Sequence, residues 1–178
     1  GGMKMIIQEE FFTMRDGVRL YTRMVLPYEN GKFPIVFIRD PYDIARNGEP
    51  YPVENYENDL FLKNGYAIVY QHVRGSGDSE GEMRPYRERE DGLDTLEIIR
   101  SKPFYNGEIY VTGQSYLATV HLCYLGTNPH DVKAAALSVQ RDNMFPWRYY
   151  NGMARGFISF DWYYKRIKRN YHQLHHHQ

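Results

Sequence analysis

The chain has 178 residues, of which 42% are hydrophobic and 25% charged, and its 22 basic side chains balance its 22 acidic ones. This length suits one domain with a sizeable core, and the absence of a long uncharged apolar run leads us to expect a globular protein with no membrane partner. The zero net charge argues against a nucleic-acid partner, although a balanced total can hide a basic patch such as the one at residues 165–169.

Cysteine usage adds little about compartment. Cys123 is the only cysteine, so no internal disulfide can form, and its place on the apolar side of an expected helix indicates a core residue. Nothing requires an oxidising environment, and we expect a cytoplasmic location. The opening Gly1-Gly2-Met3 looks like a cloning remnant before a native start. No pattern indicates a cofactor or a resident metal.

The first elements along the chain are strands. Residues 4–13 and 18–25 are strand-like runs, and the Asp-Gly pair within residues 14–17 is a strong tight-turn signal, so the three stretches predict a β-hairpin. Residues 34–38 form a short unbroken apolar run, which is typical of a strand covered on both faces. We expect this run to be a central strand of a sheet.

Helices and strands then alternate. After a loop at residues 39–43, the pattern predicts a helix over 56–63, a buried strand over 67–70, a glycine-rich loop over 74–81 and a helix over 88–99. Pro103 and an Asn106-Gly107 turn are expected to lead into the next strand, at 109–112. A helix over 116–125 and a strand over 132–139 follow. This alternation indicates an α/β protein with a mostly parallel sheet.

The turn between the strand at 109–112 and the helix at 116–125 carries the strongest chemical signal. A serine at a sharp strand-to-helix turn projects from the backbone beside the first helical N–H groups, which suits a nucleophile that develops negative charge. The residue two positions after Ser115 is Leu117, whereas the common G-x-S-x-G pattern has glycine there. The sequence alone therefore leaves two interpretations of Ser115 open. Ser115 is a nucleophile, or it is an N-cap that accepts a helix N–H.

Four separate stretches agree with one known family. Residues 14–20 resemble its opening hairpin, residues 40–43 its Asn-Pro-Tyr loop, residues 73–81 its Arg-Gly-x-Gly-x-Ser-x-Gly loop and residues 113–118 its Gly-x-Ser-Tyr-x-Gly elbow. The chain thus resembles the CocE/NonD branch of the α/β-hydrolases, which holds cocaine-esterase-like acyl esterases, α-amino-acid ester hydrolases and X-Pro dipeptidyl peptidases. Four motifs in the same order are more specific than one elbow.

The resemblance implies a fold and a site. The fold would be the N-terminal portion of an α/β-hydrolase, in which an antiparallel hairpin leads into a mostly parallel sheet. Residues 1–141 would form this core, residues 142–170 the start of a helical cap, and residues 171–178 a His-rich tail. Ser115 would attack an acyl carbonyl, while Tyr116 offers a backbone N–H and Tyr42 a phenolic hydroxyl to the oxyanion. The substrate would be a small-molecule ester or amide, or a peptide.

Three positions depart from the family pattern. Asp40 replaces an asparagine, Ala118 replaces a glycine, and His72 stands where an aspartate usually precedes the Arg-Gly pair. His72 is tempting as a general base, yet a strand-end histidine hydrogen-bonded for structure explains it more simply. Without the family, Tyr42 would also be interpreted as a turn aromatic that packs on its loop.

A serine nucleophile needs a histidine base and a carboxylate, and neither is recognisable after the elbow. His121 lies on the elbow helix, His130 lies in the following loop, and the histidines of the tail are interpreted as a tag. We therefore expect a missing C-terminal part or a second chain to supply both groups, and little turnover from these 178 residues alone. A non-catalytic α/β binding domain is the alternative. A single-stranded nucleic-acid platform at residues 147–169 is a weaker one.

Overall fold

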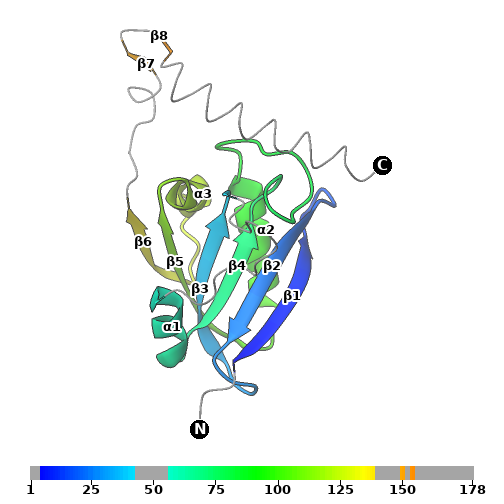
Figure 1. Cartoon of the computed structure of the whole chain (residues 1–178), viewed down its shortest axis with the longest axis vertical. Coiled ribbons are helices and arrows are strands. Elements are labelled where there is room, and N and C mark those ends of the chain that lie inside the picture. The colour runs from blue at the N-terminus through cyan, green and yellow to red at the C-terminus, as the bar shows by residue number, and fades with distance from the viewer. Residues whose placement is uncertain (1–4, 43–55, 139–148, 151–152, 155–178) are drawn as a thin grey trace. The chain divides into compact units, whose positions relative to one another are not determined.

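The computed structural model describes residues 5–42, 56–138, 149–150 and 153–154, and it divides the chain into two compact units, Gly1–Val139 and Gln140–Gln178. The first unit is a six-stranded sheet with three helices (Figure 1). Its strands are β1 (Ile6–Thr13), β2 (Arg19–Leu26), β3 (Phe33–Asp40), β4 (Ala67–His72), β5 (Tyr105–Gln114) and β6 (Val132–Ser138), and its helices are α1 (Tyr56–Lys63), α2 (Arg89–Arg100) and α3 (Tyr116–Leu125).

The strand order is β1-β2-β4-β3-β5-β6. β1 pairs with β2, and β2 with β4, in antiparallel fashion, whereas the pairs β3–β4, β3–β5 and β5–β6 are parallel. Each parallel connection passes through a helix or a long segment, as parallel pairs require. The expected α/β fold, with a hairpin leading into a mostly parallel sheet, is confirmed.

The hairpin turn forms because its residues satisfy one another. Gly17 adopts φ +85°, which a glycine reaches without steric cost, and its N–H donates to the Met14 carbonyl at 2.8 Å. The Met14 N–H donates to the Val18 carbonyl at the same distance, and the Val18 N–H reaches the Asp16 carboxylate at 3.2 Å. The Asp-Gly signal therefore predicted this turn correctly.

The central strand β3 is buried on both faces, as expected from its unbroken apolar run. Successive side chains of a strand point to opposite faces, so β3 contributes to two separate cores. Figure 1 shows α1 on one face of the sheet and α2 with α3 on the other. The α1 core contains Val36, Ile38, Ile68 and Leu62; the core on the other face contains Phe33, Ile35, Phe37, Leu96, Ile99 and Tyr124.

Two expectations about loops were wrong. Arg39 and Asp40 belong to the end of β3 rather than to a loop, and both side chains are buried. Asn106-Gly107 lies inside β5 rather than before it. Phe33 pairs with Tyr105 and Ile35 with Ile109, so β5 has two more residues than β3 over this interval. Gly107 lies within the resulting bulge and adopts φ +104°. A turn-like dipeptide can therefore sit within a strand as a bulge.

The second unit contains two short strands, β7 (Tyr149–Tyr150) and β8 (Met153–Ala154), which pair in antiparallel fashion. These two strands fall within residues 142–170, where the sequence analysis named only the start of a helical cap. The rest of the expected cap at 142–170, the basic patch at 165–169 and the tail at 171–178 lie outside the described residues. None of the helices in the described ranges is long and apolar enough to cross a membrane.

Candidate active site

Ser115 occupies a strained turn between β5 and α3. Its backbone has φ 58° and ψ −125°, a conformation that non-glycine residues rarely adopt and that costs on the order of 1–3 kcal/mol. The Ser115 N–H donates to the Ser138 carbonyl at 3.0 Å, and its own carbonyl accepts the Ala118 and Thr119 N–H groups. The side chain makes no capping hydrogen bond, so the N-cap interpretation of Ser115 is wrong.

Gly113 allows the strand and helix to meet at this turn. A Cβ on Gly113 would lie 2.4 Å from the Leu117 carbonyl oxygen and 2.8 Å from the Ala118 backbone nitrogen. Both contacts are backbone atoms that no side-chain rotation can move. The small residue at this position therefore lets α3 start immediately after β5, and this close packing lifts Ser115 to the exposed carboxyl end of the sheet.

Tyr42 approaches the serine from the loop after β3. Its hydroxyl lies 3.5 Å from the Ser115 Oγ, at the outer limit of a hydrogen bond. The loop is held by Asp40, which is buried and accepts the Tyr42 N–H on Oδ1 at 2.6 Å and the Tyr70 hydroxyl on Oδ2. The sequence indicated the meeting of Tyr42 and Ser115 only through the family resemblance, and it gave no sign of Tyr70.

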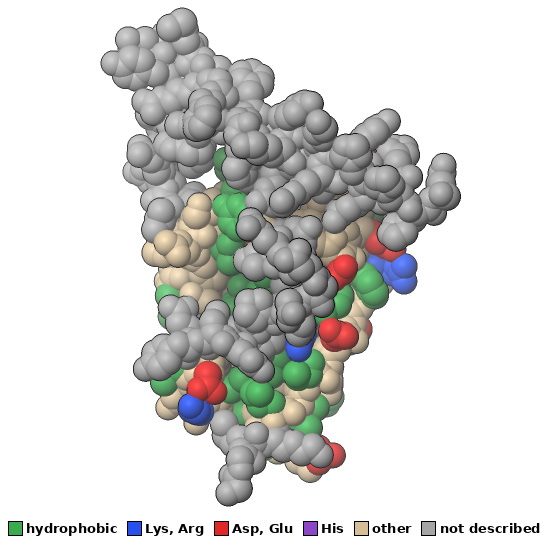
Figure 2. Space-filling view, in the orientation of Figure 1, with side chains coloured by type: hydrophobic (Ala, Val, Ile, Leu, Met, Phe, Trp, Pro, Cys, Tyr) green, Lys and Arg blue, Asp and Glu red, His purple; other side chains and the backbone are tan. Residues whose placement is uncertain are grey.

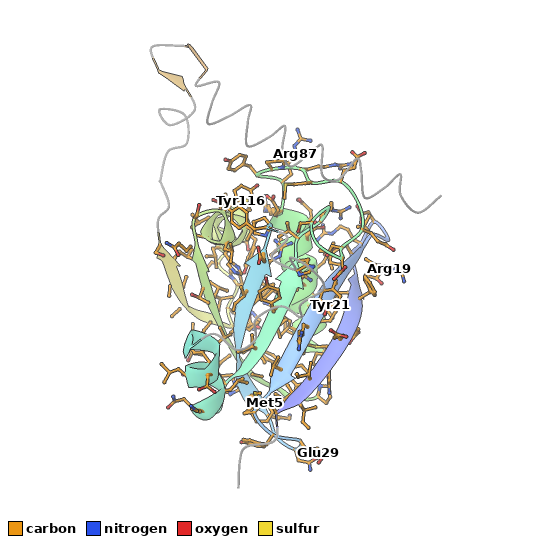
Figure 3. The ribbon with its side chains drawn as sticks, viewed as in Figure 1. Met5, Arg19, Tyr21, Glu29, Arg87 and Tyr116 are labelled. Atoms are coloured by element: carbon orange, nitrogen blue, oxygen red, sulfur yellow. The ribbon has the colours of Figure 1, made fainter. Side chains whose placement is uncertain are left out.

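Tyr116 follows the serine as the first residue of α3. Its backbone N–H lies at the amino end of the helix, which the aligned peptide dipoles make positive and which favours a developing anion. Its side chain is buried beneath the segment that leads into α2. Figure 3 shows Tyr116 beside the start of α3, with Arg87 above it pointing away from the sheet.

His72 has a structural role, as expected. It is buried at the end of β4, where its Nδ1 accepts the Asp78 N–H at 2.9 Å and its carbonyl accepts the Ser79 hydroxyl at 2.7 Å. A Cβ on Gly77 would lie 2.1 Å from the His72 Nδ1, so the glycine-rich loop wraps tightly around the ring. His72 therefore orders this loop.

Burial of His72 makes stability depend on pH. Removal from water lowers the pKa of His72 to about 4, and the pKa of the buried His121 falls to about 3 for the same reason. The unfolded chain binds these protons near pH 6.5 and the folded chain does not, so the stability present above pH 6.5 is lost as the pH falls. For His72 the loss between pH 6.5 and pH 4 is on the order of 3 kcal/mol.

Urea unfolding at a series of pH values measures this loss. His72→Asn keeps an acceptor for the Asp78 N–H and removes the titrating group, so its free energy of unfolding is expected to fall less steeply over this window than that of the unaltered chain. His121 and the carboxylates titrate in both proteins and cancel in the comparison. Equal slopes would contradict the assignment.

The glycine-rich loop is also held by an ion-pair cluster that the sequence did not indicate. Because His72 replaces the family's aspartate, the partner of Arg74 was in doubt. In the structure Arg74 bonds to Asp91 on α2 at 2.7 Å and to Asp16 in the hairpin turn at 2.8 Å. The hydrogen bond from the Arg74 guanidinium holds the pKa of the Asp16 carboxyl below its usual range.

The remaining sequence candidates lie in the core or at a distance. His121 is fully buried, and its Nδ1 shares a hydrogen bond of 2.6 Å with the Tyr124 hydroxyl. Cys123 is half-buried and faces Glu88 at 3.6 Å. Within residues 5–42 and 56–138, Tyr42 is the one side chain that approaches the Ser115 hydroxyl to hydrogen-bonding distance, and no group of three His, Cys, Asp or Glu side chains there could hold a metal ion.

An apolar groove of about 410 Å³ lies on the α1 face, where hydrophobic side chains gather in Figure 2. None of Ser115, Tyr42 and Tyr116 contributes to it. The groove is lined by Leu60 and Phe61 of α1, by Tyr66 before β4, and by Tyr110, Ala134 and Ala136 of β5 and β6. The site at the carboxyl end of the sheet is therefore a separate feature.

The mixed sheet, the two-sided helix cover and the strained serine turn define the N-terminal portion of an α/β-hydrolase fold. The family model of the X-Pro dipeptidyl-peptidase (S15 family) matches residues 16–174. The chain belongs to this family, and the resemblance to CocE/NonD hydrolases drawn from four motifs is confirmed.

Individual relatives agree with the family. The cocaine esterase of Rhodococcus sp. (strain MB1 Bresler) is 32% identical over 137 residues, which are 75% of this chain and 24% of the esterase. The structure of an α-amino acid ester hydrolase is 32% identical with a TM-score of 0.62, covering 74% of this chain and 24% of that protein. A CocE/NonD family hydrolase from Staphylococcus aureus is 27% identical with a TM-score of 0.74, covering 93% and 34%. The chain thus spans about a quarter of the length of the cocaine esterase.

Proposed function

We propose that this chain carries the nucleophile and the oxyanion donors of a serine hydrolase that cleaves acyl ester or amide bonds, X-Pro peptide bonds included. The observation that carries the proposal is the strained backbone of Ser115. Its hydroxyl makes no capping hydrogen bond to α3 and lies 3.5 Å from the Tyr42 hydroxyl. Backbone strain of this kind persists where surrounding structure holds it, and it concentrates at reactive sites.

The proposed reaction proceeds through an acyl-enzyme. The Ser115 Oγ attacks the carbonyl carbon of the substrate and gives up its proton, and the carbonyl oxygen becomes an oxyanion that accepts hydrogen bonds from the Tyr42 hydroxyl and the Tyr116 N–H. Collapse of this intermediate expels the alcohol or amine. The leaving group takes the proton that Oγ gave up. Water then attacks the acyl group, one of its protons passes to Oγ, and the acid is released.

The proton of Ser115 requires a base, and the base requires a carboxylate that orients it. Among the described residues no histidine bonds to the Ser115 hydroxyl; His72 and His121 are buried in other contacts. We therefore assign the base and its carboxylate to residues outside the described ranges or to a second chain. The relatives, of which this chain matches about a quarter to a third, are consistent with that division.

A fluorophosphonate probe tests the proposal, because it reacts with serines that a hydrolase has activated. The protein expressed from its complete reading frame is incubated with the probe, digested, and the adduct is located by mass spectrometry. We expect the label on the peptide that contains Ser115, and no label after prior denaturation. A folded protein that takes up no label, or takes it elsewhere, would support the alternative of a non-catalytic binding domain.

Replacement of Tyr42 by phenylalanine removes one oxyanion donor and keeps the ring. We expect kcat for a p-nitrophenyl ester to fall by about 10²–10³-fold with little change in KM, because the lost hydrogen bond forms only in the transition state. Tyr28→Phe is the matched control, since Tyr28 is exposed and packs on Phe33 away from the site. A Tyr42→Phe enzyme with unchanged kcat would remove Tyr42 from the mechanism.

A further inference from the structure

Glu88 is a charged residue in an unusual place. It immediately precedes α2, yet its side chain is only 3% exposed, and no lysine, arginine or histidine of the described chain forms an ion pair with its carboxylate. Burying a carboxylate is costly unless hydrogen bonds replace its water. Burial accordingly raises the pKa of Glu88 above its ordinary value.

Both carboxylate oxygens of Glu88 contact α3. Oε1 accepts the hydroxyl of Tyr116 at 2.8 Å, and Oε2 faces the thiol of Cys123 at 3.6 Å. Tyr116 and Cys123 are seven residues apart, so they lie on one side of the helix two turns from each other. The carboxylate thus bridges the first two turns of α3 and ties them to the residue before α2.

The Tyr116 phenol is held from a second direction. Its oxygen accepts the Tyr86 N–H at 2.9 Å, and the two rings meet edge to face with centroids 5.6 Å apart. Tyr86 has φ 67°, a strained conformation for a tyrosine, which this hydrogen bond helps to maintain. The phenol therefore donates to a buried carboxylate and accepts from a backbone N–H, and both contacts restrain its position.

We infer that Glu88 is a positioning residue for the reaction: by holding the Tyr116 phenol, it fixes the first turn of α3, which carries the proposed oxyanion donor, the Tyr116 N–H, and follows Ser115. This inference rests on the proposed function. Side chain and backbone N–H belong to the same residue, so a phenol that shifts carries the amide donor with it. A misplaced donor raises the free energy of the transition state and leaves the binding of the substrate in its ground state almost unchanged.

The test compares Glu88→Ala, Glu88→Gln and Tyr116→Phe in the protein expressed from its complete reading frame. Glu88→Ala and Tyr116→Phe each break the phenol contact and are expected to lower kcat about tenfold while KM stays within about twofold. Glu88→Gln keeps a side chain of the same length with an acceptor oxygen. Its kcat is expected to stay within about threefold of that of the unaltered enzyme. The double variant Glu88→Ala/Tyr116→Phe should be no slower than the slower single variant, because both remove one contact.

Several outcomes would overturn the inference. A purely structural Glu88 would change the thermal midpoint and leave kcat and KM of the folded enzyme unaltered, and independent roles would make the two losses multiply. If Glu88→Ala does not fold, Tyr116→Phe, which leaves no comparable cavity, decides the question alone. Glu90→Ala, on the exposed side of the first turn of α2, is the control that should match the unaltered enzyme.

Failure of this inference is distinguishable from failure of the proposed function. If turnover depends on Ser115 and is insensitive to Glu88 and the Tyr116 phenol, the positioning role is wrong and the serine hydrolase stands. If turnover is independent of Ser115, the proposed function is wrong, and the inference falls with it.

Discussion

Replacement of Ser115 by alanine is expected to reduce kcat for an activated ester by at least about 10⁴-fold, because no other atom at the turn can form the acyl-enzyme. Removing the nucleophile of a serine hydrolase commonly costs up to about 10⁶-fold, and the rate that remains comes from the oxyanion donors. Steady-state hydrolysis and the loss of fluorophosphonate adduct measure the effect in the protein expressed from its complete reading frame.

The thermal midpoint of Ser115→Ala should match that of the unaltered protein, since the hydroxyl approaches only Tyr42 in the described structure. Ser115→Gly offers a second comparison. Glycine adopts φ 58° without steric cost, so this variant should be equally inactive and more stable than Ser115→Ala by about 1 kcal/mol. Ser101→Ala, at the exposed end of α2, is the control for a serine lost elsewhere. Ester hydrolysis that survives in Ser115→Ala would refute the nucleophile assignment.

Replacement of Gly113 by alanine is expected to damage both stability and activity. The added Cβ would lie 2.4 Å from the Leu117 carbonyl oxygen, so the start of α3 must move away from β5. Such overpacking costs about 3 kcal/mol, and a shift of about 1 Å at a reacting group costs about 10²-fold in rate. Urea unfolding and ester hydrolysis measure the two effects.

Gly126→Ala is the matched control for Gly113→Ala. Gly126 follows α3 with φ −62°, and a Cβ there meets no atom within 4 Å. An alanine should therefore leave the activity unchanged and raise the free energy of unfolding slightly, because it restricts the unfolded chain. Equal behaviour of the two variants would show that close packing at Gly113 does not shape the turn.

Local chemistry predicted much of the fold. Unbroken apolar runs predicted β3 and β4, and the Asp-Gly pair predicted the hairpin turn. Acidic residues in the first turn, together with apolar residues at helical spacing, predicted α2. Each of these signals resides in a few consecutive residues. The bulge at Asn106-Gly107 escaped, because the same dipeptide suits a turn or an irregular strand, and only the pairing of Ile35 with Ile109 decides between them.

The site was predictable only in part, for a related reason. Ser115 and Tyr116 are neighbours in sequence and carry a recognisable pattern, whereas the approach of Tyr42 was suggested by the family motif alone. Glu88 gave no sequence signal, because a glutamate before a helix ordinarily faces water near the positive helix end. Its burial depends on Tyr116 and Cys123, which lie 28 and 35 residues further along the chain. Contacts between distant segments of this kind are a property of the folded sheet.

The hydrogen bond from the Ser115 amide to the Ser138 carbonyl joins the nucleophile to the last residue of β6. Within the described strands β6 has one neighbour, β5, so it forms a border of the sheet. Because the Ser115 amide is anchored to this border strand, a displacement of β6 would also displace the backbone that carries the nucleophile.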